Sequence, residues 1–291
     1  MMTMALQAYA KRYLPQPAVD VLRLMKYRME LATFPRRVVD HRYGSHELKM
    51  TISDRVASEW YDRDWTLPPE IGFFSRGQIA KNGRIFDLGA HQCLIAMLLA
   101  RDIVPDGQVV AVEANRHNAE RARENVALNR VGNVEVVHAI VSRTSGQAHA
   151  DFSFNSRVQS GLGARVGESI DGISIDDMSR WMGWPDLVYL DIEGFEIEAL
   201  KGASLTLARW CHWFVELHGD ETLGRYGARN ADILQFFDMT KFARYLCMPD
   251  ENSFRLVAEN EPVPTERCFL IFSPRSTQLL DGSQDRDTAP R

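Results

Sequence analysis

The chain has 291 residues, of which 45% are hydrophobic and 25% charged, and its formal net charge is −5. These values are typical of a soluble globular protein with a large core, and the acidic balance excludes a whole-molecule attraction to nucleic acid. The four cysteines are widely spaced and form no CxxC pair, which excludes a zinc knuckle or a disulfide framework and indicates a reducing compartment.

The first 45 residues differ from the rest, and we treat them as a basic N-terminal extension. Residues 1–42 hold eight Lys and Arg against three Asp and Glu. Apolar residues at helical spacing predict an amphipathic helix over 18–32. Its apolar positions are Val21, Leu22, Met25 and Met29. Such a helix either packs on the main domain with a solvated basic face or contacts an anionic membrane surface or a partner.

The start of the chain lacks the pattern of a secretory signal. No run approaches the roughly 20 apolar residues that a membrane span needs. We therefore expect a cytoplasmic protein.

Strand-like and helix-like patterns alternate along the centre of the chain. Strands are predicted at 46–52, 84–87, 108–113, 134–140, 187–191 and 213–217, and helices at 94–101, 117–128 and 195–200. This alternation predicts βαβ units and a parallel sheet, hence an α/β fold. Residues 242–247, 254–257 and 268–272 are strand-like with no helix between them, so an antiparallel hairpin should finish the sheet. The polar segment 275–291 is expected to be a disordered tail.

A single glycine follows the strand that ends at Asp87. Gly89 lies where the chain turns into the next helix, and a glycine there lets ligand atoms approach the backbone. Asp87 can bind an amino group, and the helix start beyond Ala90 and His91 offers free N–H groups to a carboxylate. Glu113 ends the next strand, where a carboxylate can accept hydrogen bonds from both ribose hydroxyls. The pattern predicts a nucleoside pocket.

The residues after Gly89 favour S-adenosylmethionine over a dinucleotide. A dinucleotide site needs G-x-G-x-x-G so that the backbone can approach the pyrophosphate. Here His91 and Leu94 stand at the second and third glycine positions and would obstruct a pyrophosphate. Past the third strand of the alternation, Ala139 and Ile140 either contact the adenine or simply end a buried strand.

Acidic residues and a histidine follow two further strands. Asp191 and Glu193 come directly after one strand, and Glu216 and His218 stand at the end of the next. Ligands of an open α/β sheet bind outside the carboxyl ends of its strands, so we expect these four side chains to converge near the sulfonium. They are the candidate catalytic residues.

Two catalytic schemes suit this set of side chains. Methyl transfer depends mainly on proximity and alignment, but a hydroxyl acceptor also needs a general base, for which His218 or a carboxylate is a candidate. Alternatively, the same groups hold a divalent cation that acts as a Lewis acid. The sequence does not distinguish the two schemes and assigns no metal ligands.

The motifs resemble the FkbM family of S-adenosylmethionine-dependent methyltransferases over roughly residues 50–272. The matching runs are Phe86-Asp-Leu-Gly-Ala90, Val112-Glu-Ala-Asn115, Ile175-Asp-Asp177, Asp191-Ile-Glu-Gly-Phe-Glu196, Leu200-Lys-Gly-Ala203 and Glu216. The resemblance implies a seven-stranded, Rossmann-like class I methyltransferase sheet in a domain over 46–274. It also implies O-methylation of a sugar or natural product. The chain departs from the family at His91-Gln92-Cys93, where N-x-G is common.

Other functions are weighed against this one. A binding protein that keeps the fold without chemistry would account for the altered loop, and an NAD(P)-dependent oxidoreductase is opposed by the missing glycines. A nucleic-acid methyltransferase is opposed by Asp191-Ile-Glu-Gly, which is neither an Asn/Asp-Pro-Pro-aromatic motif nor a site with a nucleophilic cysteine. The expected acceptor is a small molecule or glycan. A further group of residues either lines the acceptor site or simply packs as a lid: Trp60, Trp65, Phe73, Phe74 and the 155–163 loop.

Overall fold

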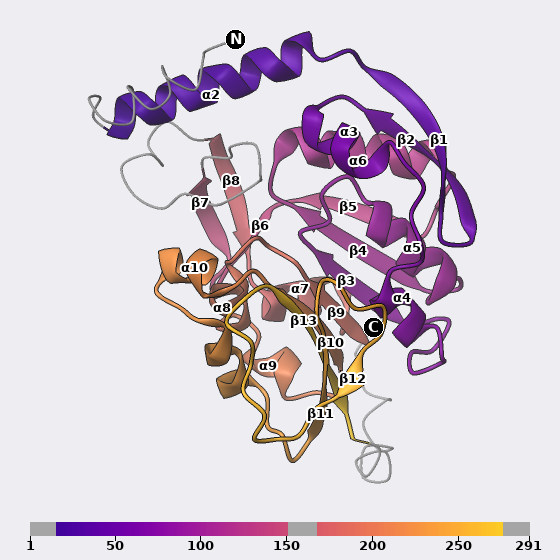
Figure 1. The fold of residues 1–291 in the computed structure, drawn as a ribbon, viewed down its shortest axis with the longest axis vertical. Coiled ribbons are helices and arrows are strands. Elements are labelled where there is room, and N and C mark those ends of the chain that lie inside the picture. The colour runs from indigo at the N-terminus through magenta and orange to yellow at the C-terminus, as the bar shows by residue number, and fades with distance from the viewer. Residues whose placement is uncertain (1–15, 151–167, 276–291) are drawn as a thin grey trace.

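The computed structural model describes residues 16–150 and 168–275, and its centre is a mostly parallel sheet (Figure 1). Within these residues, the strand order is β12-β11-β13-β10-β9-β3-β4-β5. The strands are β3 (Arg84–Leu88), β4 (Gln108–Glu113), β5 (Val134–His138), β9 (Leu187–Leu190), β10 (His212–Leu217), β11 (Phe242–Cys247), β12 (Arg255–Leu256) and β13 (Cys268–Pro274). The predicted parallel sheet is therefore confirmed.

The last strand of the sheet in chain order, β13, lies between β10 and β11 and runs antiparallel to both. Strands β5, β4, β3, β9 and β10 are parallel to one another. The antiparallel finish is thus confirmed, and the short strand β12 extends the sheet beyond β11. The sheet has the α/β architecture that the motifs imply, with β12 as an eighth strand beyond the seven expected.

Alternate residues of each central strand face two different cores. Along β4, Val110 and Val112 pack into one core, whereas Val109 and Ala111 pack into the other. Each face of the sheet is therefore apolar, and each is covered by helices. The carboxyl ends of the strands are left as the place for a ligand.

The helices follow the strands in the predicted alternation. On one face lie α5 (Leu94–Asp102) and α6 (Arg116–Leu128), and on the other lie α7 (Ile175–Met182) and α8 (Glu196–Leu200). The remaining short helices are α3 (Arg55–Tyr61), α4 (Pro69–Phe74), α9 (Ser204–Leu207), α10 (Asp220–Leu223) and the 3₁₀ segments Gly224–Tyr226 and Asn230–Phe236.

The predicted strand 134–140 is interrupted in the structure. β5 ends at His138, and after the amide of Ala139 donates to the carbonyl of Glu113 (3.2 Å) the chain leaves the main sheet. The next strand, β6 (Ile140–Val141), pairs with β8 (Glu168–Ile173), which also pairs with β7 (Gly146–Ala150). The residue pattern of 134–140 carries no signal of which sheet each part joins, so this break was not predicted.

The N-terminal region holds the predicted helix and an additional strand. Helix α2 (Gln16–Thr33) lies across the top of Figure 1 and leads into the hairpin of β1 (Arg37–Tyr43) and β2 (His46–Ile52). The boundary expected after residue 45 falls in the turn of this hairpin. Among the described residues, no helix combines the length and apolar character that crossing a bilayer requires.

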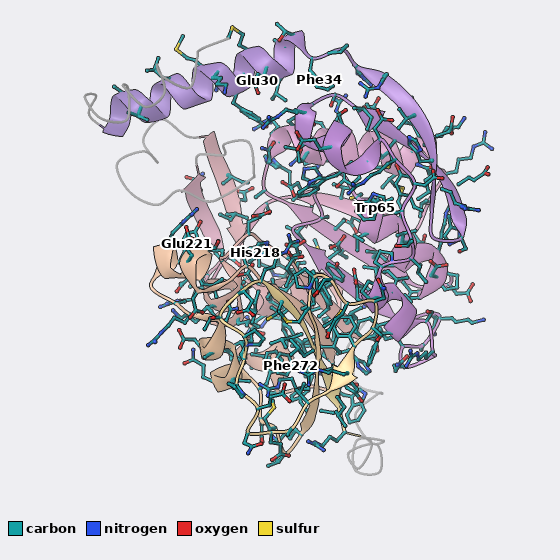
Figure 2. All side chains as sticks on the ribbon, in the orientation of Figure 1. Glu30, Phe34, Trp65, His218, Glu221 and Phe272 are labelled. Carbon is teal, nitrogen blue, oxygen red and sulfur yellow. The ribbon has the colours of Figure 1, made fainter. Side chains whose placement is uncertain are left out.

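Three of the predicted apolar positions of α2 face solvent. Leu22 is 38% exposed, and Met25 and Met29 are each 63% exposed. The helix meets the body of the protein through other side chains, because the Asn115 amide donates to the Tyr27 hydroxyl (3.0 Å). The C-terminal end of the helix approaches the body near the side chains that are labelled Glu30 and Phe34 in Figure 2.

Candidate active site

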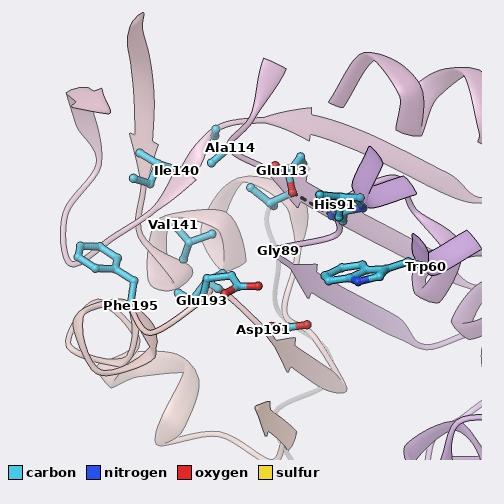
Figure 3. Close-up of a pocket in the computed structure, with 14 residues that line it drawn as sticks. Trp60, Gly89, His91, Glu113, Ala114, Ile140, Val141, Asp191, Glu193 and Phe195 are labelled. Carbon is cyan, nitrogen blue, oxygen red and sulfur yellow. Dashed lines mark hydrogen bonds between the residues drawn. The ribbon is translucent and has the colours of Figure 1, made fainter. Parts of the chain in front are cut away.

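A cleft opens at the carboxyl ends of β3, β4 and β9 (Figure 3). The predicted site residues that line it are Gly89, His91, Glu113, Ala139, Ile140, Asp191 and Glu193. Asp87, Ala90, Glu216 and His218 stand behind this lining, within the strands and loops that form it.

Glu113 is the acidic group at the end of β4. One carboxylate oxygen accepts from the amide of His91 (2.9 Å) and the other from the amide of Asn115 (2.7 Å). The side chain is 3% exposed, and this burial raises the pKa of Glu113 to about 7. The two backbone donors and the Asn118 side chain fix the carboxylate at the wall of the cleft. A carboxylate has about four acceptor sites, so Glu113 can still accept a hydrogen bond from a ribose hydroxyl.

Asp87 is a buried acid without a complete set of partners. It is 1% exposed, and its Oδ2 atom has no hydrogen-bond partner among the described residues. Burial and the nearby Glu113 carboxylate raise the pKa of Asp87 to about 7. An unsatisfied buried carboxylate is costly. The amino group of a methionine moiety, bound directly or through water, would compensate it, so this residue fits the expected cofactor.

Gly89 joins two loops of the site. A Cβ atom at this position would lie 1.7 Å from the carbonyl oxygen of Asp191, and its φ of +93° is one that glycine adopts readily. The amides of Gly89 and Ala90 both donate to the carbonyl of Val112, at 2.9 and 3.0 Å. The glycine is therefore required for the ends of β3, β4 and β9 to meet.

The His91-Gln92-Cys93 loop adopts a backbone that asparagine and glycine would favour. His91 has φ 46° and Cys93 has φ 65°, both in the left-handed region. Gln92 anchors the loop, because its side-chain amide donates to the Asp54 carboxylate (2.8 Å) and its backbone carbonyl accepts from the side chain of Asn125 (3.1 Å). The departure from N-x-G thus changes the side chains of the loop and keeps left-handed residues at both ends.

The four candidate catalytic side chains lie together at the ends of β9 and β10. The Nε2 atom of His218 is 3.5 Å from Asp191 Oδ1, 3.4 Å from Glu216 Oε1 and 3.8 Å from Glu193 Oε2. Its Nδ1 atom is 3.0 Å from Glu196 Oε1. Ligand atoms of Asp191, Glu216 and His218 lie within 4.8 Å of one another, so these three are the candidate cation ligands.

The protonation of this cluster separates the candidate bases. Burial lowers the pKa of His218, but the hydrogen bond to Glu196 and the carboxylates around it raise that pKa to about 10. The ring is therefore protonated at neutral pH and is not a base in this state. Burial and the Glu216 carboxylate raise the pKa of Asp191 well above its usual value. Asp191 also lines the cleft, which makes it the candidate base.

Two further residues complete the cluster, and the sequence analysis did not select them. Glu196 is fully buried and accepts from the amide of Gly194 (2.9 Å) as well as from His218. Arg267, just before β13, forms an ion pair with Glu216. Glu196 stands inside the quoted acidic motif, whereas no local pattern distinguishes Arg267.

Most of the aromatic residues expected at the acceptor site are elsewhere. Trp60 lines the cleft, and its ring lies 5.2 Å from that of His91. Phe73 and Phe74 are 7% and 1% exposed and belong to the core, so of the two expected roles they have packing and not acceptor binding. Trp65 packs on the ring of Tyr43 instead. The 155–163 loop and most of the expected tail lie outside the described residues.

Comparisons with known proteins also indicate a methyltransferase. The model of the methyltransferase FkbM domain matches residues 87–253. No curated protein matches the chain.

Solved structures resemble it at low identity. A SAM-dependent O-methyltransferase from Thermotoga maritima is 12% identical, with 82% of this chain and 77% of that chain covered and a TM-score of 0.42. Precorrin-6y C5,15-methyltransferase from Geobacter metallireducens is 12% identical, with 68% of this chain and 86% of that chain covered and a TM-score of 0.39. An rRNA methylase from Streptococcus thermophilus is 10% identical, with 70% of this chain and 93% of that chain covered and a TM-score of 0.43.

Proposed function

This chain belongs to the FkbM methyltransferase family, and from that premise we propose that it transfers a methyl group from S-adenosylmethionine to a hydroxyl group of a sugar, glycan or natural product. The observation that carries the hydroxyl acceptor is the position of Asp191. This carboxylate lines the cleft, has a raised pKa and stands 3.5 Å from a protonated imidazole. A hydroxyl group needs such a base because it is a poor nucleophile while it keeps its proton.

The residues divide the work of the reaction. The bound cofactor supplies an electrophilic methyl group on a sulfonium. Glu113 binds the ribose, and Asp87 binds the amino group of the methionine moiety, directly or through water. Asp191 takes the proton of the acceptor hydroxyl as the new O–CH₃ bond forms and the S–CH₃ bond breaks. The positive charge of the sulfonium favours the ionised form of Asp191 before the transfer.

The charge of the cluster supports a cationic cofactor. Four carboxylates (Asp191, Glu193, Glu196 and Glu216) face two cations (His218 and Arg267). With all six groups ionised, the cluster retains negative charge, which attracts a sulfonium. The structure thereby supports a donor that carries positive charge near the reacting methyl group.

A divalent cation at Asp191, Glu216 and His218 is the alternative scheme. Such an ion would have to displace the proton of His218 and compete with Arg267 for Glu216. We therefore propose the metal-free base, and chelation tests the choice.

The test is a screen of sugar, glycan and polyketide acceptors with a labelled methyl donor, run with and without EDTA. We expect methylation of a hydroxyl group that EDTA does not reduce. Loss of transfer in EDTA, restored by Mg²⁺, would establish the metal scheme instead. Transfer to nitrogen alone would contradict the hydroxyl acceptor.

A titration with S-adenosylmethionine separates the remaining alternatives. No binding at millimolar cofactor would contradict the proposed donor. Binding without transfer to any acceptor would favour a protein that keeps the fold without chemistry, and protection by NAD(P)H would favour an oxidoreductase.

We also propose that α2 contacts an anionic membrane surface. Leu22, Met25 and Met29 are exposed on this helix, and the exposed Arg28 adds positive charge. The expected result is co-sedimentation with vesicles that contain phosphatidylglycerol, and its loss in a Met25→Glu, Met29→Glu variant. Equal sedimentation of the variant would contradict the contact.

A further inference from the structure

Tyr61 and His91 form a hydrogen-bonded pair in the wall of the cleft. The Tyr61 hydroxyl lies 2.6 Å from Nδ1 of His91, and Tyr61 is 3% exposed. Among the described residues, Nδ1 of His91 is the only hydrogen-bond partner of this hydroxyl. A buried hydroxyl that donated elsewhere would leave its proton without an acceptor, so Tyr61 donates to Nδ1 of His91.

The protonation states agree with this direction. Burial raises the pKa of Tyr61 well above its usual value, so the hydroxyl keeps its proton. Burial lowers the pKa of His91 to about 4, so the ring is neutral. A neutral imidazole carries one N–H group. Because Nδ1 accepts from Tyr61, the proton of His91 resides on Nε2.

The Nε2–H group of His91 is available to a ligand. Among the described residues, this atom has no hydrogen-bond partner. The ring lines the cleft, where Figure 3 shows it between Glu113 and Trp60. The ring of Trp60, at 5.2 Å, packs on the imidazole and restricts its rotation. His91 is therefore an oriented neutral donor.

The other charged side chains of the cleft indicate which group of the ligand accepts from the His91 Nε2–H group. The charged side chains that line the described part of the cleft are Glu113, Asp191 and Glu193, and all of them are acidic. They suit the hydroxyl, amino and sulfonium groups of the cofactor but repel its carboxylate. That carboxylate needs N–H donors, which His91 and the nearby start of α5 provide; the N-cap of α5, Cys93, makes no side-chain cap.

We propose that Tyr61 is a positioning residue that holds His91 as an Nε2–H donor to the carboxylate of the bound cofactor. The inference rests on the proposed function, since it takes S-adenosylmethionine as the ligand. It also gives His91 a role that depends on this chain's departure from N-x-G. The tyrosine lies outside the matched region 87–253 and acts through the histidine.

The test compares two probes by isothermal titration. S-adenosylhomocysteine contains the amino-acid carboxylate, whereas methylthioadenosine keeps the adenine, ribose and thioether and lacks it. We expect Tyr61→Phe and His91→Leu each to weaken S-adenosylhomocysteine binding about tenfold, as for one hydrogen bond, and to leave methylthioadenosine binding unchanged. Adding Tyr61→Phe to His91→Leu should cause no further loss.

Two controls separate positioning from folding. Tyr43→Phe removes another buried hydroxyl, which donates to the backbone of Tyr61 without contacting His91, and should change affinity less than about twofold. His91→Asn restores an amide donor and should bind S-adenosylhomocysteine more tightly than His91→Leu. In ¹⁵N-histidine spectra, the His91 signal should report the Nε2–H form in the wild type and a tautomer mixture in Tyr61→Phe.

Two results would overturn the inference. One is an equal loss for both probes, or a loss from Tyr61→Phe that persists in the His91→Leu background, because Tyr61 would then act on the fold. The other is a wild-type protein that binds neither probe at millimolar concentration. That second result would also overturn the proposed function, so the two failures are distinguishable.

Discussion

The two edges of the cleft bury acidic groups in different ways. At the ends of β3 and β4, Glu113 is held by backbone amides and Asp87 keeps an oxygen without a partner, with no cationic side chain among the described contacts of either. At the ends of β9 and β10, the acids surround His218 and Arg267. The first edge is suited to binding hydrogen-bond donors and the second to holding and moving a proton. Variants at the two edges should therefore separate binding from turnover.

The largest effect is expected at the second edge. Asp191→Asn removes the proposed base and should lower kcat about 1,000-fold, within the range for general-base catalysis. The affinity for S-adenosylhomocysteine should change much less, because its ribose contact is at the other edge. Both quantities are measured on the same preparation, with Glu221→Gln as control, since that side chain is 96% exposed on α10. An unchanged kcat would contradict the assignment of proton transfer to the ends of β9 and β10.

At the first edge, Glu113→Ala should act on binding. Loss of a charge-assisted hydrogen bond to the ribose should weaken S-adenosylhomocysteine binding about 100-fold. Methylthioadenosine should be weakened equally, because it contains the same ribose. At saturating cofactor kcat should stay close to that of the wild type. Unchanged affinity in calorimetry would place the ribose elsewhere.

Gly89→Ala should affect both edges, because it separates the loops that meet there. The new Cβ atom would overlap the carbonyl of Asp191. We expect a loss of about 2 kcal/mol in the free energy of unfolding, measured by urea denaturation. Gly132→Ala is the matched control, since a Cβ atom there meets nothing within 4 Å. Similar stability of the two variants would show that the loops can move apart.

The smallest effect concerns the pH dependence of the ligand-free protein. The pKa of Asp87 is raised to about 7 in the fold, so the native state binds this proton more tightly than the unfolded chain. The contribution of this group to stability is therefore full below about pH 4 and is lost as the pH rises to about 7. We expect Tm to fall by a few degrees over this range, and less in Asp87→Asn. Identical pH profiles would contradict the assignment.

The sequence predicted the frame of the molecule better than the contacts within it. The strand 108–113 was predicted with its observed limits, because a sheet covered on both faces requires the continuous apolar run that this strand has between its polar ends. β1 was not predicted, since Asp40, His41 and Arg42 interrupt its apolar residues on an exposed hairpin. The strand at 134–140 was predicted too long, because its pattern continues across the change of sheet at Ala139.

For the site, the sequence predicted where the acids gather but not how they are protonated. His218 and each carboxylate of the cluster were candidates for the base until their neighbours were known. The protonated state of His218 depends on Glu196, and Glu216 is paired with Arg267, which comes from a segment distant in sequence. Likewise the pairing of Tyr61 with His91 joins residues that no local pattern connects.

The position of β13 has a consequence for synthesis of the protein. Glu216 on β10 pairs in register with Phe269 on β13, and Arg267 immediately precedes that strand. While the ribosome is still translating this region, β10 has an open edge and Glu216 lacks its arginine. The side of the cleft at the ends of β9 and β10 is thus completed last. A chain that stops before residue 267 leaves one side of β10 unpaired. Premature termination there should yield an aggregating polypeptide rather than a soluble but inactive one.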